Sequence, residues 1–159
     1  MVSGVLKSWS FQTSSIKHLF SDSLKKDTFK ITLSGDSLLA SQVTFEIIDS
    51  KGIDIYIDTF PAIYLLGFAS DVSDTRLKKE IYITNRIKEF FSPDNFLLPA
   101  IKKEGEMDPE YSQIEKAIWN EIKSDPNKVG FYYLQGEEDG RRIAYSKKLQ
   151  KVVIYFACC

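Results

Sequence analysis

The sequence contains few of the residues from which catalytic and metal sites are built. Its one histidine is His18, and its two cysteines are the last residues, Cys158 and Cys159. Neither a Cys-x-x-Cys nor a His-x-x-x-His motif occurs, so the usual ligands of a zinc site are missing. A nucleophile needs a base held against it, and no Gly-x-Ser-x-Gly elbow accompanies His18. The sequence therefore favours a non-catalytic protein with no metal and no cofactor.

Glycine-rich loops and long apolar runs are also missing. The eight glycines are spaced as turn and bulge residues, which argues against a phosphate-binding loop. The longest apolar run, 60–69, is about half as long as a bilayer requires, so we expect a buried core segment there. The first residues lack an uninterrupted apolar stretch typical of a secretory signal. Together with two cysteines expected as free thiols, this predicts a cytoplasmic protein without a membrane partner.

The charges are balanced and interleaved. There are 21 basic and 22 acidic residues, which gives a formal net charge of −1. Neighbouring basic residues occur only as isolated pairs such as Arg141-Arg142 and Lys147-Lys148. Nucleic-acid binding normally needs a clustered basic stripe, so the sequence argues against a nucleic-acid partner.

The first half of the chain shows alternating patterns typical of antiparallel strands. We expect strands at 28–33, 43–48 and 53–58, separated by polar turns that contain glycine. The third strand carries isoleucines on one face and Asp54, Tyr56 and Asp58 on the other, which we expect to be solvated. Before these strands, the pattern indicates a strand at 5–12 and a short helix that begins near Ser14 or Ser15.

Two longer helices are expected in the middle of the chain. Asp74 is a plausible N-cap for a helix that runs to about Phe91, although 81–84 is β-branched and remains open between helix and strand. Asp108-Pro109-Glu110 has the features of a second helix start, and this helix should end near 124–126.

The last thirty residues predict an antiparallel meander. Three β-prone runs, 129–135, 141–145 and 151–157, are separated by short polar turns. The outer two runs are apolar on both faces, which favours central, doubly covered strands. The whole pattern predicts one α+β domain over 1–159, with a mainly antiparallel sheet that includes this three-stranded meander and two or three helices packed on it.

Two acidic loops and an arginine pair offer the best candidate for a binding surface. Tyr, Trp and Arg are the residue types that anchor protein interfaces, and any of Tyr56, Tyr132, Tyr145 and Trp119 would join this surface if it is exposed. The residues expected to bind a partner are Glu104, Glu106, Asp108, Glu137, Glu138, Asp139, Arg141, Arg142 and Tyr145.

The sequence favours a protein that binds another protein, most simply an immunity or inhibitor-type protein that neutralises a toxin or enzyme. In organisation it is similar to small bacterial immunity proteins, which are often stand-alone α+β domains. One alternative is a small hydrolase or transferase that uses the carboxylates of Glu46, Asp54 and Asp58, with Glu46 and Asp54 close together across a hairpin. Another is a structural or ligand-binding subunit that forms a homo-oligomer through the meander. Monomer and homodimer both remain open.

Overall fold

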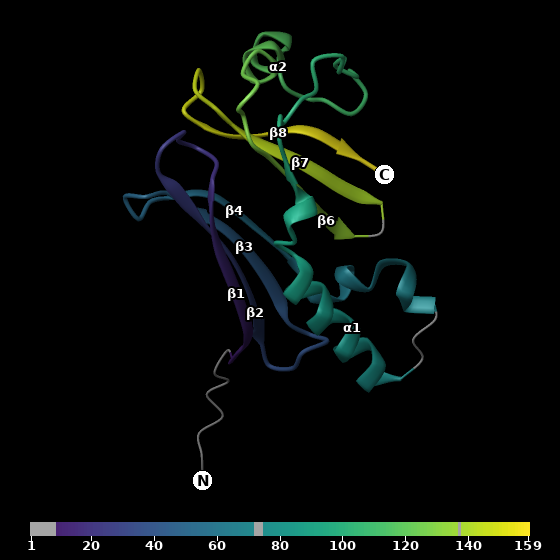
Figure 1. Cartoon of the computed structure of the whole chain (residues 1–159). Helices are drawn as coiled ribbons and strands as arrows, with labels where there is room; N and C mark the ends of the chain where they lie inside the picture. The colour runs from purple at the N-terminus through teal and green to yellow at the C-terminus, as the bar shows by residue number, and fades with distance from the viewer. Residues whose placement is uncertain (1–8, 72–74, 137) are drawn as a thin grey trace.

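Two four-stranded antiparallel sheets form the framework of the protein (Figure 1). The computed structural model describes residues 9–71, 75–136 and 138–159. It confirms the α+β class and the C-terminal meander, and it divides the expected sheet into two. The first sheet contains β1 (Trp9–Leu19), β2 (Lys26–Gly35), β3 (Gln42–Ile48) and β4 (Asp54–Pro61), in chain order. The second contains β5 (Phe96–Leu97), β6 (Gly130–Gly136), β7 (Asp139–Ser146) and β8 (Lys151–Cys158), also in chain order.

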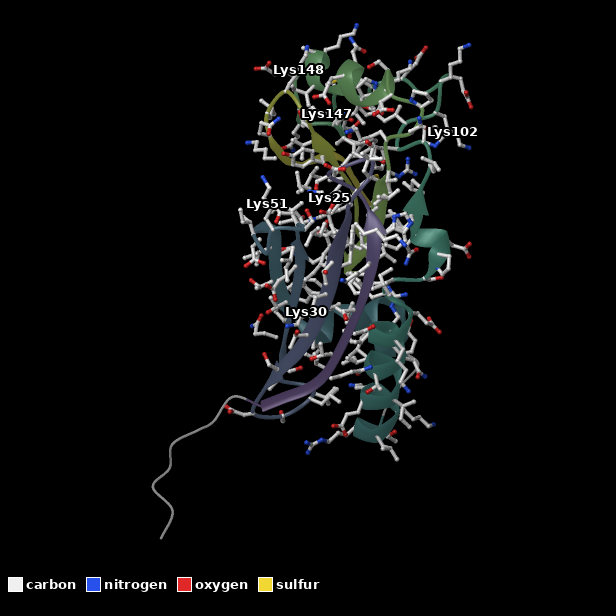
Figure 2. The ribbon with its side chains drawn as sticks, turned by 60° about the vertical axis from the view of Figure 1, so that its left-hand side comes forward. Lys25, Lys30, Lys51, Lys102, Lys147 and Lys148 are labelled. Carbon is white, nitrogen blue, oxygen red and sulfur yellow. A yellow bond between two sulfur atoms is a disulfide. The ribbon has the colours of Figure 1, made fainter. Side chains whose placement is uncertain are left out.

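Period-two alternation determines which face of the first sheet is buried. Successive side chains of a strand point to opposite faces, so every second residue can be apolar and face the core. Six such residues of β2 and β3 are fully buried: Phe29, Ile31, Leu33, Val43, Phe45 and Ile47. Residues between them, such as Lys30 and Glu46, lie half-buried on the opposite face. Figure 2 shows Lys30 on that face.

Helix α1 (Arg76–Glu89) packs below the second sheet, beside the inner face of the first sheet (Figure 1). Its N-cap is Thr75, whose side chain accepts a hydrogen bond from the Lys78 backbone N–H, whereas Asp74 lies outside the described residues. The open question at 81–84 is resolved as helix. Ile83 and Ile87 are fully buried and lie four residues apart, the spacing that places two side chains on one helical face.

Two apolar cores lie on the two faces of the second sheet. The larger core lies between the first sheet, α1 and β6, and it includes residues of the 3-10 segment η1 (Ala62–Asp71). Ala62, Leu65 and Leu66 of η1 are buried, as expected for the apolar run at 60–69. The smaller core lies under α2 (Lys116–Lys123) and consists mainly of Ala100, Ile101, Ile118, Trp119, Ile122, Ala144, Val153 and Tyr155.

The prediction of a short helix that begins near Ser14 or Ser15 is wrong, because residues 14–19 belong to β1. Residues 9–19 pair antiparallel with β2, so that Ile16 lies opposite Phe29 and His18 opposite Asp27. A helix from Ser14 or Ser15 would carry Leu24 on its apolar face with Ile16, Leu19 and Phe20, but Leu24 is 88% exposed. The hydrogen-bond ladder with β2 is a long-range interaction, and it outweighs a weak local preference for helix.

The helix expected from Asp108 begins instead at Lys116. Asp108 does start one turn, since its carbonyl oxygen accepts hydrogen bonds from the N–H groups of Tyr111 and Ser112. The turn then stops because the chain bonds to β8. The Tyr111 carbonyl accepts from Ala157 N–H at 2.8 Å, and Ser112 Oγ donates to the Tyr155 carbonyl at 2.8 Å. The first of these bonds occupies a backbone carbonyl that a continuous helix would use, and the second holds the Ser112 side chain against β8.

Strand β8 is not central as expected, although both its faces are covered. Within the described residues it pairs only with β7, and the more polar β7 lies between β6 and β8. Its apolar faces instead serve the two cores: Val153 and Tyr155 belong to the smaller core, whereas Val152 and Ile154 pack against the larger one. The expectation of two free thiols after β8 is also wrong, because the structure joins the neighbouring residues Cys158 and Cys159 in a disulfide.

Glu121 of α2 holds the turn between β7 and β8, and its removal should destabilise the fold. Its carboxylate accepts hydrogen bonds from Ser146 Oγ at 2.5 Å and from the N–H groups of Lys147 and Lys148 at 3.2 Å each. Losing these bonds in Glu121→Ala should lower the free energy of unfolding by about 2 kcal/mol at pH 7. Urea unfolding, with the exposed Glu110→Ala as a control, measures this loss.

The same variant should show the pH dependence of this contact. Burial alone would raise the pKa of Glu121, but the bonds from Ser146 and the turn amides outweigh it and lower this pKa below the ordinary value of 4.5. A lowered pKa in the folded state stabilises the fold above the unfolded-state pKa, and this stability is lost as the pH falls through the folded value. The difference between wild type and Glu121→Ala should therefore shrink below pH 4.5. A difference that is constant with pH would contradict this assignment.

Candidate functional site

A polar network joins the two sheets where β4 meets β6 and β7. Asp58 on β4 accepts hydrogen bonds from Tyr133 Oη at 2.7 Å and from Arg141 Nη1 at 3.2 Å. Gln135 Nε2 donates to the same carboxylate at 3.1 and 3.2 Å. Because Tyr133 gives its only hydroxyl proton to Asp58, Tyr56 must donate the 2.6 Å hydrogen bond between the two hydroxyls. The network thus fixes β4 against the second sheet.

Tyr56, Tyr133 and Arg141 of this network keep their protons near neutral pH. Burial raises the pKa of Tyr133, and the neighbouring Tyr56 and Asp58 raise it further. Burial also raises the pKa of Tyr56. For Arg141, burial acts against the charge, but the hydrogen bond with Asp139 at 3.1 Å helps to raise its pKa overall. These groups are therefore suited to a structural connection and not to proton transfer.

The prediction of a solvated face for Asp54, Tyr56 and Asp58 is wrong for the last two residues. Both are half-buried and hydrogen-bonded to the second sheet. Ile57, between them in the sequence, is 57% exposed instead. A polar strand face can be buried when its groups find hydrogen-bond partners, and here those partners come from residues more than seventy positions away.

The opposite face of the second sheet carries an aromatic–arginine strip, which consists of Tyr111, Tyr132, Arg142 and Phe156. Arg142 on β7 lies opposite Tyr132 on β6 and Phe156 on β8. Its guanidinium carbon is 4.8 Å from the centre of the Phe156 ring, and the Tyr111 ring centre is 5.8 Å from that of Phe156. Arg142 is exposed, and the three aromatic residues are half-buried. The strip therefore presents a charge and apolar rings together.

The strip borders a cavity of about 330 Å³. Tyr132, Arg142 and Phe156 line it, together with Asp94, Leu97 and the disulfide-bonded cysteines at the C-terminus. Sequence analysis identified Arg142 and Tyr132 but missed Tyr111 and Phe156. The hydrogen bond from Ala157 N–H to the Tyr111 carbonyl brings these two together, and no local pattern in the sequence reveals that contact.

The structure separates the other predicted partner-binding residues into three places. Glu104, Glu106 and Asp108 are exposed in the loop before α2. Figure 1 places that loop beside α2 and the β6–β7 turn at the far end of the second sheet. Of the turn residues, Glu138 is exposed, Glu137 lies outside the described residues, and Asp139 and Arg141 are bonded to each other.

The remaining predicted residue, Tyr145, lies apart from the strip. It is half-buried on β7, and its hydroxyl donates a 3.4 Å hydrogen bond to Gln150 Oε1 in the β7–β8 turn. Trp119, another aromatic that an interface could use, is buried in the smaller core. Among the predicted partner-binding residues that the structure describes, Arg142 therefore forms part of a hollowed aromatic surface, and the conditional candidate Tyr132 lies opposite it.

The carboxylates of the enzymatic alternative do not share a pocket. Glu46 and Asp54 do approach each other, as expected: burial first, and then the charge and hydrogen bonding of Asp54, raise the pKa of Glu46. Asp58, however, bonds to the second sheet on the opposite face. None of the three lines the 330 Å³ cavity or a second cavity of about 540 Å³.

The described part of the chain offers no group of three or more His, Cys, Asp or Glu residues that could hold a metal ion. Of the described helices, none combines the length and apolar character needed to cross a membrane. Comparisons with protein-family models, with curated proteins and with solved structures found no significant match.

Proposed function

We propose that this protein is a non-catalytic binding module that recognises a partner protein through the aromatic–arginine strip. The observation that carries the proposal is the exposed Arg142, stacked on Phe156 beside a cavity. The particular form proposed is an immunity or inhibitor-type protein that neutralises a toxin or enzyme. A cytoplasmic location belongs to the proposal and is tested by cell fractionation.

The strip has the physical properties of an interface anchor. Arginine and tyrosine are enriched among the residues that contribute most to protein binding. A guanidinium above an aromatic ring is attracted to the ring face, which limits the side-chain freedom that binding would otherwise remove. Arg142 is thus already oriented, while its hydrogen-bond donors remain accessible. The cavity beside it can accept a side chain of the partner.

The chemistry of the strip describes the partner. A carboxylate of the partner would meet Arg142, and an apolar side chain beside it would enter the cavity against Leu97 and Phe156. The loop that leads into Tyr111 carries the exposed Glu104 and Glu106, which favour basic residues on the partner surface that meets this loop. The proposed partner surface is therefore mixed in charge, in agreement with the balanced charge of this chain.

Replacement of Arg142 tests the proposal. Arg142→Ala removes the central cation and should weaken partner binding by about thirtyfold, the effect of about 2 kcal/mol at an interface anchor. Arg142→Lys keeps the charge but loses the planar stack on Phe156, so its affinity for the partner should lie between those of wild type and Arg142→Ala. Affinity capture from the native host, followed by titration calorimetry with the purified partner, provides the measurement.

The matched control is Arg76→Ala, which removes an arginine with a 70% exposed side chain on α1. This variant should bind the partner like wild type. Equal affinities for wild type, Arg142→Ala and Arg76→Ala would refute the strip as the binding surface. Light scattering measures the mass of the protein in solution. If wild type has the mass of a dimer and Arg142→Ala that of a monomer, the strip binds a second copy of this chain and not a different protein.

A further inference from the structure

A second cavity, of about 540 Å³, lies at the junction of three turns. The connection between β1 and β2 forms one wall, the segment 125–129 another, and Lys147 of the β7–β8 turn a third. Asp22 and Lys147 both line it. Hydrogen bonds from the Leu24 and Lys25 N–H groups are the main cause that lowers the pKa of Asp22, and the charges of Lys25 and Lys147 lower it further. Figure 2 shows Lys147 in its turn and Lys25 on the segment below. The volume falls within the usual range for small-molecule sites.

Lys128 is the unusual residue of this cavity. It is 4% exposed, and its backbone is fixed by hydrogen bonds with Asp125 and Ala100. No hydrogen bond or ion pair to its ammonium group is present within the described residues, although a buried charge normally needs a partner. The described residues also include no fully buried side-chain N or O atom without a hydrogen-bond partner. The Lys128 Nζ must therefore keep some contact with solvent, and the cavity that Lys128 lines provides it.

The charges nearest to Lys128 support this placement. Burial is the main cause that lowers its pKa, followed by the charge of Lys147, whereas Asp125 and Glu121 act in the opposite direction. Lys147 and Asp125 line the same cavity. The Glu121 carboxylate is already occupied by Ser146 and the turn amides. The ammonium group thus lies at the cavity wall with unused hydrogen-bond donors.

The two acids of the cavity wall, Asp22 and Asp125, are hydrogen-bonded within their own turns. Asp22 accepts hydrogen bonds from the N–H groups of Leu24 and Lys25 at 2.7 and 3.0 Å, and Asp125 accepts one from Asn127 N–H at 2.9 Å. These carboxylates therefore stabilise their own turns. Their negative charge would still repel a ligand that carries several anionic groups.

His18 and the apolar side chains complete the wall. The His18 Nδ1 lies 2.8 Å from the Leu19 carbonyl, which can only accept, so Nδ1 carries a proton and Nε2 remains available. The ring stacks on Phe96 with a centroid distance of 4.1 Å, which fixes its plane. Phe20, Leu98 and Val129 supply the apolar part of the lining.

We propose that this cavity binds a small organic anion, with one carboxylate or phosphate group held by Lys128 and Lys147 and an apolar body against Leu98 and Val129. The ammonium group of the 4% exposed Lys128, which reaches the cavity without a protein partner among the described residues, supplies the anion site. The apolar wall distinguishes an organic ligand from an inorganic ion. This site is separate from the aromatic–arginine strip, so the inference goes beyond the proposed binding of a protein.

The test is a titration followed by amide chemical shifts. Phenyl phosphate and benzoate each combine one anionic group with an apolar ring, and they should shift the amides of 18–23, 98, 125–129 and 147. Inorganic phosphate lacks the apolar body and benzyl alcohol lacks the charge, so both should bind at least about tenfold more weakly. The relative affinities of phenyl phosphate and benzoate show whether the anion site prefers phosphate or carboxylate.

Three variants test whether the two lysines of the cavity bind the anionic group. Lys128→Met should fold, because it replaces a buried charge by an apolar side chain of similar length, and it should weaken binding by about tenfold or more. Lys147→Gln should weaken binding by roughly threefold to tenfold. Lys148→Gln, a neighbour on the same turn that does not line the cavity, should bind like wild type. Circular dichroism confirms folding of each variant.

The proposal is overturned by any of three results. The first is the absence of shifts at the cavity amides with millimolar phenyl phosphate and benzoate. The second is unchanged affinity in folded Lys128→Met. The third is binding of benzyl alcohol or inorganic phosphate as tightly as the organic anions, since either would show that the charge or the apolar wall contributes nothing.

Discussion

Replacing Asp58 by alanine should lower the free energy of unfolding by about 3 kcal/mol, because it removes the shared acceptor of the inter-sheet network. Tyr133, Gln135 and Arg141 all donate to this carboxylate. The pair formed by Arg141 and Asp58 is largely shielded, with side-chain exposures of 23% and 15%. Without Asp58, a shielded cation keeps Asp139 as its one ion-pair partner among the described residues, and the Tyr133 hydroxyl loses its acceptor.

Urea unfolding of Asp58→Ala measures this loss, and two further variants separate its causes. Asp58→Asn keeps the shape and one acceptor but removes the charge, so it should lose less stability than Asp58→Ala. Asp54→Ala, four residues earlier on the same strand, removes an exposed carboxylate next to Glu46 and should change stability by no more than about 0.5 kcal/mol. If Asp58→Ala is as stable as Asp54→Ala, the network does not hold the sheets together.

Replacing Phe45 by alanine should cost about 4 kcal/mol, the largest effect expected of a single substitution in the larger core. Phe45 is fully buried. Its ring centre lies 5.0–5.8 Å from ring centres on β4, on β6 and in the connection that follows α1, so it contacts three parts of the core at once. These rings belong to Tyr56, Phe90, Phe91, Phe131 and Tyr133. A cavity at this position cannot be filled by movement of a single neighbour.

The measurement is again the free energy of unfolding, with near-ultraviolet circular dichroism to follow the packing of the aromatic side chains. Phe45→Leu retains most of the apolar volume and should cost less than half as much as Phe45→Ala. Ile57→Ala, which truncates a 57% exposed side chain on the neighbouring strand, is the control and should cost well under 1 kcal/mol. A loss of less than about 1 kcal/mol for Phe45→Ala would contradict the packing described for this core.

Local sequence patterns predicted the strands whose burial repeats regularly along the chain. Alternation identified β2 and β3, because a strand with one buried face must repeat every second residue. The meander strands were identified instead as β-prone runs between short polar turns. The signal was weaker where long-range contacts compete with local preference. β1 has polar residues that read as a helix start, yet it pairs with β2 along its length. The turn at Asp108 has a good helix start, yet it ends where Tyr111 and Ser112 bond to β8.

The candidate sites depend even more on contacts between distant segments. Arg142 was recognisable as a candidate because arginine beside tyrosine is typical of interfaces. Its stacking partner Phe156 follows only from the register of β7 with β8. Lys128 gave no signal at all, because an isolated lysine near a turn is normally solvated. Its burial results from the meeting of three turns that lie far apart in the sequence.

The order of polar and apolar residues by itself determined the class of the fold and the positions of most strands. The composition determined the shortage of groups for nucleophilic or zinc chemistry. Tertiary structure alone decided which strand faces are buried, because Asp58 and Tyr56 turn inward only where Tyr133 and Arg141 meet them. It also decided where surfaces are hollowed. Both follow from one physical fact: the cost of burying a polar group depends on the partner it finds, and that partner is set by the three-dimensional fold.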